Sequence, residues 1–147
     1  MEYNTIVVGI DFSEPSDTAL AAAAELAVQF SARLHIVHGF HFPIPAMGVY
    51  EVSLPDGYFE SVREAARARI EAAAKQVAAP GLEVEWHLTE VPAAAAIVRV
   101  ATESKADLIV VGTRGNTGLK HVVLGSVAER VMRTAPCSVL TVKPRDE

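Results

Sequence analysis

The sequence of 147 residues predicts an α/β fold with three layers, α/β/α, around a doubly wound parallel sheet of five strands. Two observations predict it. Short runs rich in β-branched residues alternate with longer stretches of helical period along the whole chain. Strands that are separated by helices imply parallel pairing through right-handed crossovers. We therefore expect one domain over residues 1–147, with a Rossmann-like strand order of 3-2-1-4-5.

Each element follows from its local pattern. The five strands are expected at residues 5–10, 33–39, 82–89, 107–111 and 138–142. The four main helices are expected to begin near Ser13, Tyr58, Pro92 and Ser126. The 107–111 segment is the most apolar, which favours a central place in the sheet, whereas the alternation in 82–89 is typical of an edge strand. Residues 41–57 form the longest irregular stretch.

Composition excludes several classes of function. The formal net charge of −5 argues against a nucleic-acid surface, because there is no excess of positive charge to displace counterions. A single cysteine, Cys137, excludes an internal disulfide and a cysteine zinc cluster, and we expect it to be buried. The N-terminal residues show no signal peptide, and no apolar run is long enough for membrane insertion. The expected location is the cytoplasm.

Glycines gather after the fourth expected strand, with the spacing Gly112-x2-Gly115-x9-Gly125-Ser126. Glycine lets the backbone approach a ligand closely, and successive N–H groups in such a turn can bind an anion. Ser126 is expected as the N-cap of the last helix, in a capping box that ends at Glu129. A helix N-terminus favours phosphate. The residues alone leave two interpretations open, a phosphate cradle and a well-capped turn.

Other familiar sites are absent from the sequence. The chain has no G-x-G-x-x-G after the first strand, no phosphate-binding G-x4-G-K-[ST], and no G-x-S-x-G. No trio of nucleophile, base and orienting group stands out, so no catalytic residue is predicted. The spacing of His35, His38 and His41 does not indicate a metal site, because residues 35 and 38 of a strand point to opposite faces.

The glycine spacing resembles the nucleotide-binding signature of the universal stress protein family. The segments TIVVGIDFSEPSDTAL, RLHIVHG and ADLIVVGTRGNTGLKHVVLGSVAERVMRTAPCSVLTVK extend this resemblance over essentially the full chain. It implies a Rossmann-like fold and an ATP site, with AMP or ADP as related ligands and Mg²⁺ on the phosphates. The residues implied in nucleotide binding are Gly9, Ile10, Asp11, Gly39, Val111, Gly112, Thr113, Arg114, Gly115, Gly125, Ser126 and Val127.

Individual roles follow from the same resemblance. Gly9 and Ile10 would line the base pocket, and the backbone near Gly39 would contact adenine, although valine is common at that position in the family. Asp11 would bond ribose or hold Mg²⁺, and its alternative role is to cap the following helix. Arg114 would neutralise phosphate or lie solvated in the loop.

Three functions remain open at this point. The first is a nucleotide-dependent switch or scaffold in the stress response, acting with a protein partner that the sequence does not identify. The resemblance implies that it is a homodimer paired through Ser138 to Val142, with a tetramer as a higher assembly. The second is a slow ATPase or nucleotidyl transferase that uses the same site. The third is an interaction module that binds no nucleotide.

Overall fold

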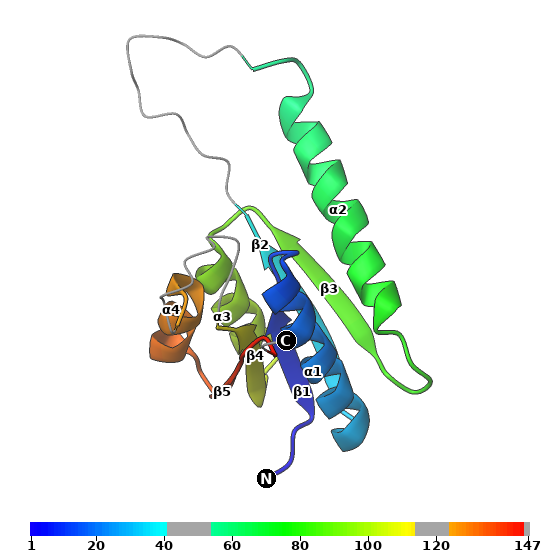
Figure 1. The fold of residues 1–147 in the computed structure, drawn as a ribbon, viewed down its shortest axis with the longest axis vertical. Coiled ribbons are helices and arrows are strands. Elements are labelled where there is room, and N and C mark those ends of the chain that lie inside the picture. Colours follow the sequence, from blue (N-terminus) through cyan, green and yellow to red (C-terminus); the bar gives the residue numbers. More distant parts are fainter. Residues whose placement is uncertain (41–53, 114–123, 146–147) are drawn as a thin grey trace.

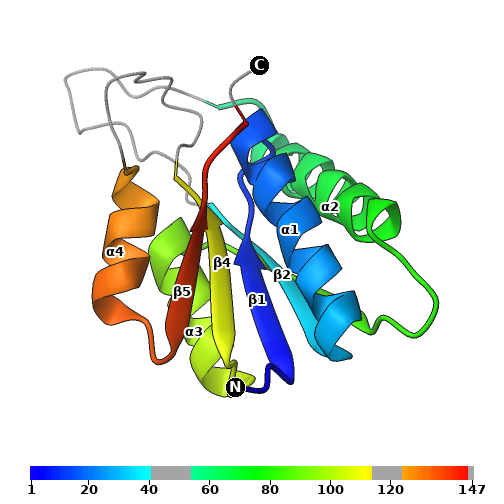
Figure 2. The same ribbon diagram turned by 60° about the horizontal axis from the view of Figure 1, so that its bottom comes forward.

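The computed structural model describes residues 1–40, 54–113 and 124–145. Its five strands are β1 (Thr5–Gly9), β2 (Arg33–Gly39), β3 (Val84–Thr89), β4 (Leu108–Gly112) and β5 (Ser138–Val142). They form one parallel sheet in the order β3-β2-β1-β4-β5. Figure 2 shows β2, β1, β4 and β5 of this sheet side by side. The predicted fold class and strand order are confirmed.

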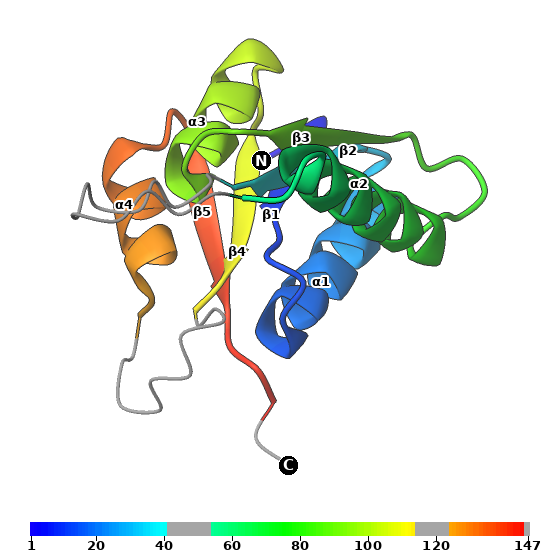
Figure 3. The same cartoon turned by 90° about the horizontal axis from the view of Figure 1, so that it is seen from above.

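Four helices cover the two faces of this sheet. They are α1 (Glu14–Phe30), α2 (Tyr58–Gln76), α3 (Ala93–Glu103) and α4 (Ser126–Thr134). In Figure 3, α1 and α2 lie on one side of the sheet and α3 and α4 on the other. Figure 1 shows α2 alongside the edge strand β3. The result is the three-layer arrangement that the alternating pattern predicts.

The core consists of two apolar clusters, one on each face of the sheet. Alternation along β1 divides its buried side chains between them, because neighbouring residues of a strand point to opposite faces. Val8 packs beneath α1 and α2, whereas Val7 packs beneath α3 and α4. β1 is the middle strand of the sheet, and β4 beside it is also an interior strand, as its apolar run indicates. An apolar run reports burial on both faces, which β1 and β4 share, and not the place of a strand within the sheet.

The N-termini of α1 and α4 show one prediction confirmed and one that is wrong. Ser13 is the N-cap of α1, and its side chain accepts a hydrogen bond from the backbone N–H of Ser16. At α4 the N-cap is Gly125, whose carbonyl accepts from the N–H of Glu129 at 3.0 Å. Ser126 is therefore the first helical residue, and the expected capping box does not form. The carboxylate of Glu129 instead bonds Arg133 one turn later, at 2.7 Å.

Several smaller expectations can be compared with the structure. Trp86 is partly buried and packs against the cluster beneath α1 and α2. Cys137 is half-buried against the other cluster, and burial raises the pKa of its thiol, which lowers its reactivity. The 41–53 stretch, with His41, lies outside the described residues. Among those that are described, no helix is both long and apolar enough to cross a membrane.

Candidate functional site

A pocket of about 230 Å³ opens at the carboxyl ends of β1 and β4. The chain leaves β1 toward β2 on one side of the sheet, while β4 pairs with β1 on the other side. A crevice forms where strand order reverses in this way, and open α/β sheets bind ligands there. The position of the pocket agrees with the expectation from the fold class.

Most of the predicted site residues meet at this pocket. Eight of them line it: Gly9, Ile10, Asp11, Val111, Gly112, Gly125, Ser126 and Val127. They come from two segments about a hundred residues apart in sequence, the end of β1 and the region from β4 to α4. Arg114 and Gly115 lie outside the described residues. Gly39 and Thr113 are described, but they are not among the lining residues.

Gly39 serves the packing of α3. A Cβ atom at this position would lie 2.8 Å from the Cβ of Ala96 and 2.8 Å from the carbonyl oxygen of Val91. Only a residue without a side chain lets the start of α3 approach the end of β2 so closely. The glycine at position 39 therefore has a structural reason in this chain.

Thr113 connects three elements beneath the pocket. Its side chain is buried, and its backbone N–H donates to the carbonyl of Val142 at 3.0 Å. Its own carbonyl accepts from the N–H of Gly125 at 2.6 Å. These bonds hold the end of β4 against β5 and bring the start of α4 back to the end of β4. Thr113 thus positions the two glycines, Gly112 and Gly125, that line the pocket.

Asp11 lies in the turn between β1 and α1, where its carboxylate is held by hydrogen bonds. Its Oδ1 accepts from the backbone N–H of Ser13 at 3.0 Å and also from the Ser13 hydroxyl. The next residue, Phe12, has a positive φ of 62°, a conformation that non-glycine residues seldom adopt. Asp11 both supports the helix start and lines the pocket, so its two expected roles are compatible in this structure.

A stack of side chains supports this turn from below. The Nδ1 of His38 lies 2.8 Å from the carbonyl oxygen of Ile10, and its ring contacts Phe12 with centroids 4.4 Å apart. The guanidinium of Arg69 also contacts Phe12 and lies 4.3 Å from the centre of its ring. Burial lowers the pKa of His38, while the Ile10 carbonyl and Asp11 raise it in part. A neutral His38 with its proton on Nδ1 therefore donates to Ile10.

The N-terminus of α4 forms the opposite wall of the pocket. Its N-cap, Gly125, has no side chain that could satisfy the first amides of the helix, and both Ser126 and Val127 line the pocket. The first N–H groups of a helix have no partner within the helix, and the helix dipole is positive there. This end of α4 is suited to a phosphate or another anion. The Ser126 hydroxyl is a further donor.

Sequence reasoning missed five lining residues: Ser16, Val37, Ala93, Ile97 and Ala128. Ser16 belongs to the first turn of α1, where its hydroxyl donates to the carbonyl of Ser13 at 3.0 Å. The other four are apolar or small, and they sit on elements whose patterns already explain them as core. No motif distinguishes such residues, because pocket walls and cores use the same side chains.

Comparisons with known proteins agree with the fold and with the sequence resemblance. Residues 2–143 match the model of the universal stress protein family. Universal stress protein MJ0531 of Methanocaldococcus jannaschii is 35% identical, over 99% of this chain and 85% of its own. A universal stress protein solved in complex with cAMP is 31% identical, with a TM-score of 0.60 over 97% of this chain and 98% of its own.

The universal stress protein of Archaeoglobus fulgidus, solved in complex with dAMP, is also similar. It is 28% identical, with a TM-score of 0.67, and the match covers 97% of this chain and 100% of the other. The family match spans nearly the whole chain, and the fold, the pocket and the glycine spacing agree with it. The chain therefore belongs to the universal stress protein family.

Proposed function

We propose that the protein binds an adenine nucleotide, ATP in the first place, and acts as a nucleotide-dependent switch or scaffold in the stress response. The observation that carries this proposal is the pocket between the end of β1 and the N-terminus of α4. One wall is apolar and the opposite wall is a helix N-terminus. A ligand with a flat apolar base and a phosphate matches both walls.

Each part of the pocket suits one part of a nucleotide. The base would lie against apolar lining residues such as Ile10, Val37 and Ile97. The phosphates would accept from the first amides of α4 and from the Ser126 hydroxyl. Asp11 would bond the ribose, or hold Mg²⁺ on the phosphates, since a carboxylate and phosphate oxygens are the usual ligands of this ion. Bound Mg²⁺ would neutralise phosphate charge.

Two structural neighbours support the choice of adenine. They are solved with cAMP and with dAMP, and both ligands are adenine monophosphates. The extension to a triphosphate rests on the glycine spacing, whose second member, Gly115, lies outside the described residues. ATP, ADP and AMP are therefore compared directly in the experiment below.

The lining favours binding over catalysis. Within the described part of the chain, Asp11 is the one titratable side chain that lines the pocket. A hydrolase would need a group that activates water, and Asp11 is already held by two hydrogen bonds from Ser13. The alternative, a slow ATPase, requires release of phosphate above background with Mg²⁺ and saturating ATP. Release at the background rate would exclude it.

A homodimer is part of the proposal. β5 is an edge strand of the sheet, and Leu140 on it is 38% exposed. An exposed edge presents unpaired backbone groups, and two copies related by a two-fold axis can pair such edges. We propose that Ser138–Val142 pairs with the same strand of a second copy, and that the dimer acts in the cytoplasm.

The deciding experiment measures nucleotide in freshly purified protein by mass spectrometry, and then titrates ATP, ADP and AMP by calorimetry. Gly125→Val should abolish binding without unfolding the chain, because φ and ψ of −69° and 159° suit any residue and the side chain would enter the pocket. Ala72→Val, which introduces the same side chain on the exposed face of α2, should bind normally. Protein that carries no nucleotide and gives no heat would instead be an interaction module.

A further inference from the structure

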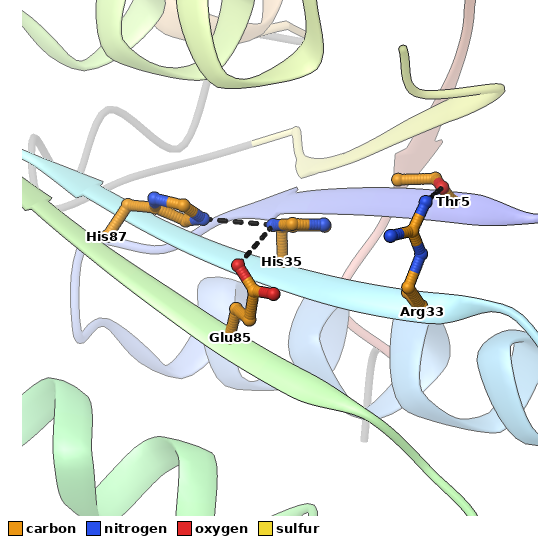
Figure 4. Close-up of polar contacts among 5 residues, drawn as sticks. All are labelled: Thr5, Arg33, His35, Glu85 and His87. Atoms are coloured by element: carbon orange, nitrogen blue, oxygen red, sulfur yellow. Dashed lines mark hydrogen bonds and ion pairs between the residues drawn. The ribbon is translucent and has the colours of Figure 1, made fainter. Parts of the chain in front are cut away.

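We propose that His35, Glu85 and His87 form a binding site for a divalent transition metal such as Zn²⁺, separate from the nucleotide pocket. The three residues lie on β2 and β3, and none of them lines the pocket. Figure 4 shows the three side chains directed toward one another above the two strands. The site is independent of the function proposed above.

The register of the two strands creates this cluster. His35 pairs with Glu85, and Val37 pairs with His87. His87 is thus two residues beyond Glu85, and because side chains alternate between faces, all three project from the same face of the sheet. This is the face covered by α3, which packs on β1 and β2 and leaves β3 at the edge. The cluster therefore spans the border between the covered sheet and its open edge.

The distances are close to those of a metal centre. The Nδ1 of His35 lies 2.9 Å from the Nε2 of His87 and 3.7 Å from the Oε2 of Glu85. One possible ligand atom from each of the three residues lies within 4.8 Å of the other two. Ligand atoms about 2.0–2.2 Å from a tetrahedral Zn²⁺ are separated by roughly 3.3–3.6 Å from each other. The two imidazoles need to separate by only a few tenths of an ångström.

The ligand chemistry selects a class of metal. Two imidazoles and one carboxylate suit Zn²⁺, Co²⁺, Ni²⁺ or Cu²⁺, whereas Mg²⁺ and Ca²⁺ prefer oxygen ligands. Three protein ligands also leave a coordination position for water or an anion. An imidazole binds a metal ion in its neutral form, through the lone pair of a ring nitrogen.

Access and charge favour the same conclusion. The side chain of His35 is 7% exposed, while that of Glu85 is 66% exposed, so the carboxylate can bring a cation from solvent to the imidazoles. The guanidinium of the nearby Arg33 donates to the hydroxyl of Thr5 at 3.3 Å (Figure 4). The competing structural role is a hydrogen bond between His35 and His87 alone, which requires no metal.

The test is a Zn²⁺ titration of the untagged, nucleotide-free chain by calorimetry, with Co²⁺ absorption as a second readout. We expect one ion per chain. His87→Gln should weaken binding by at least about 100-fold and Glu85→Gln by at least about 10-fold, since losing even a group that orients a ligand costs 10–100-fold. Glutamine at position 87 still offers His35 a hydrogen-bond partner, so the fold should be retained. His38→Asn, at a half-buried histidine outside the cluster, should bind Zn²⁺ normally.

Two results would overturn the proposal. One is a wild-type chain that takes up no Zn²⁺ or Co²⁺ at micromolar concentration. The other is stoichiometric binding that survives both His87→Gln and Glu85→Gln, which would place the ion elsewhere. A rise in thermal stability with Zn²⁺, present in wild type and absent in both variants, separates a metal site from a purely structural pair. Calorimetry of ATP with the same variants reports on the nucleotide pocket, so the two proposals fail separately.

Discussion

A Cβ atom on Gly9 would lie 2.3 Å from Cδ1 and 2.9 Å from Cγ1 of Ile97. The end of β1 and the first turns of α3 are therefore in contact at a point where no side chain fits. Both residues line the pocket. The glycine at the end of β1 is explained by this packing, and the same packing places an isoleucine on the wall where the base of a nucleotide would lie.

Gly9→Ala should destabilise the protein by about 1–3 kcal/mol, the usual cost of overpacking a core. Ile97→Val removes the Cδ1 atom that clashes, at a cost of about 0.5–1.5 kcal/mol by itself. The double variant should be more stable than the sum of the two costs implies, as measured by urea denaturation. Ile70→Val lies in the core on the other face of the sheet, and its cost should simply add to that of Gly9→Ala. If the costs of Gly9→Ala and Ile97→Val also simply add in their double variant, the two residues are not in contact.

Asp107 holds the start of β1 and should matter for stability. Its Oδ2 accepts from the backbone N–H of Asn4 at 2.8 Å and of Thr5 at 2.9 Å. Asp107→Ala should lower the free energy of unfolding by about 1–3 kcal/mol, because two amides lose a charged acceptor. Glu129→Ala, which breaks an exposed ion pair with Arg133 on α4, should cost about 0.5 kcal/mol or less. Equal losses in the two variants would show that the bonds of Asp107 are not stabilising.

His38 should make stability depend on pH. Its pKa in the folded protein is lowered below the usual 6.5, mainly by burial. Below pH 6.5 the unfolded chain therefore binds more protons than the folded one, and the free energy of unfolding falls as the pH drops toward the folded pKa. Asp11 opposes this shift and Arg69 adds to it.

The variant His38→Asn isolates that contribution. An asparagine Nδ2 can still donate to the carbonyl of Ile10, but it does not titrate. In nucleotide-free protein with a chelator present, denaturation at pH 7.5 and pH 5.5 should show a smaller loss for the variant than for wild type. Part of the loss should remain, since burial also lowers the pKa of His35. The same loss in both proteins would show that His38 is not the group responsible.

The dimer proposed through β5 makes a prediction about assembly. Leu140→Lys places a charge on the edge where the second copy would pair, and edge lysines oppose such pairing. The variant should be a monomer at micromolar concentration in sizing with light scattering, whereas wild type should be a dimer. Val28→Lys, at a position 52% exposed on α1, should leave the dimer unchanged. A wild-type monomer under these conditions would exclude pairing through β5.

The candidate pocket was in large part predictable because its glycines follow strands. Gly9, Asp11, Gly112 and Gly125 lie next to strand ends or a helix start, and parallel strands bring their carboxyl ends to one edge of the sheet. The N-cap of α4 was expected at Ser126 but is Gly125, one residue earlier. The N-cap is the residue whose carbonyl accepts the first hydrogen bond of the helix, and a glycine can do this without a side chain. Ile97 could not be identified, because a pocket wall and a core position have the same pattern.

Local pattern in the sequence determined the class of fold and the two segments that meet at the pocket. The hydrophobic period records which face of each element is buried, and that information is local. The tertiary structure decided what lies across from what. The pairing of His35 with Glu85, and of Val37 with His87, depends on the register of β2 against β3, which packing across the sheet selects. A histidine spacing within one segment cannot reveal this pairing, whereas the folded chain brings His35 to His87, a histidine 52 residues away.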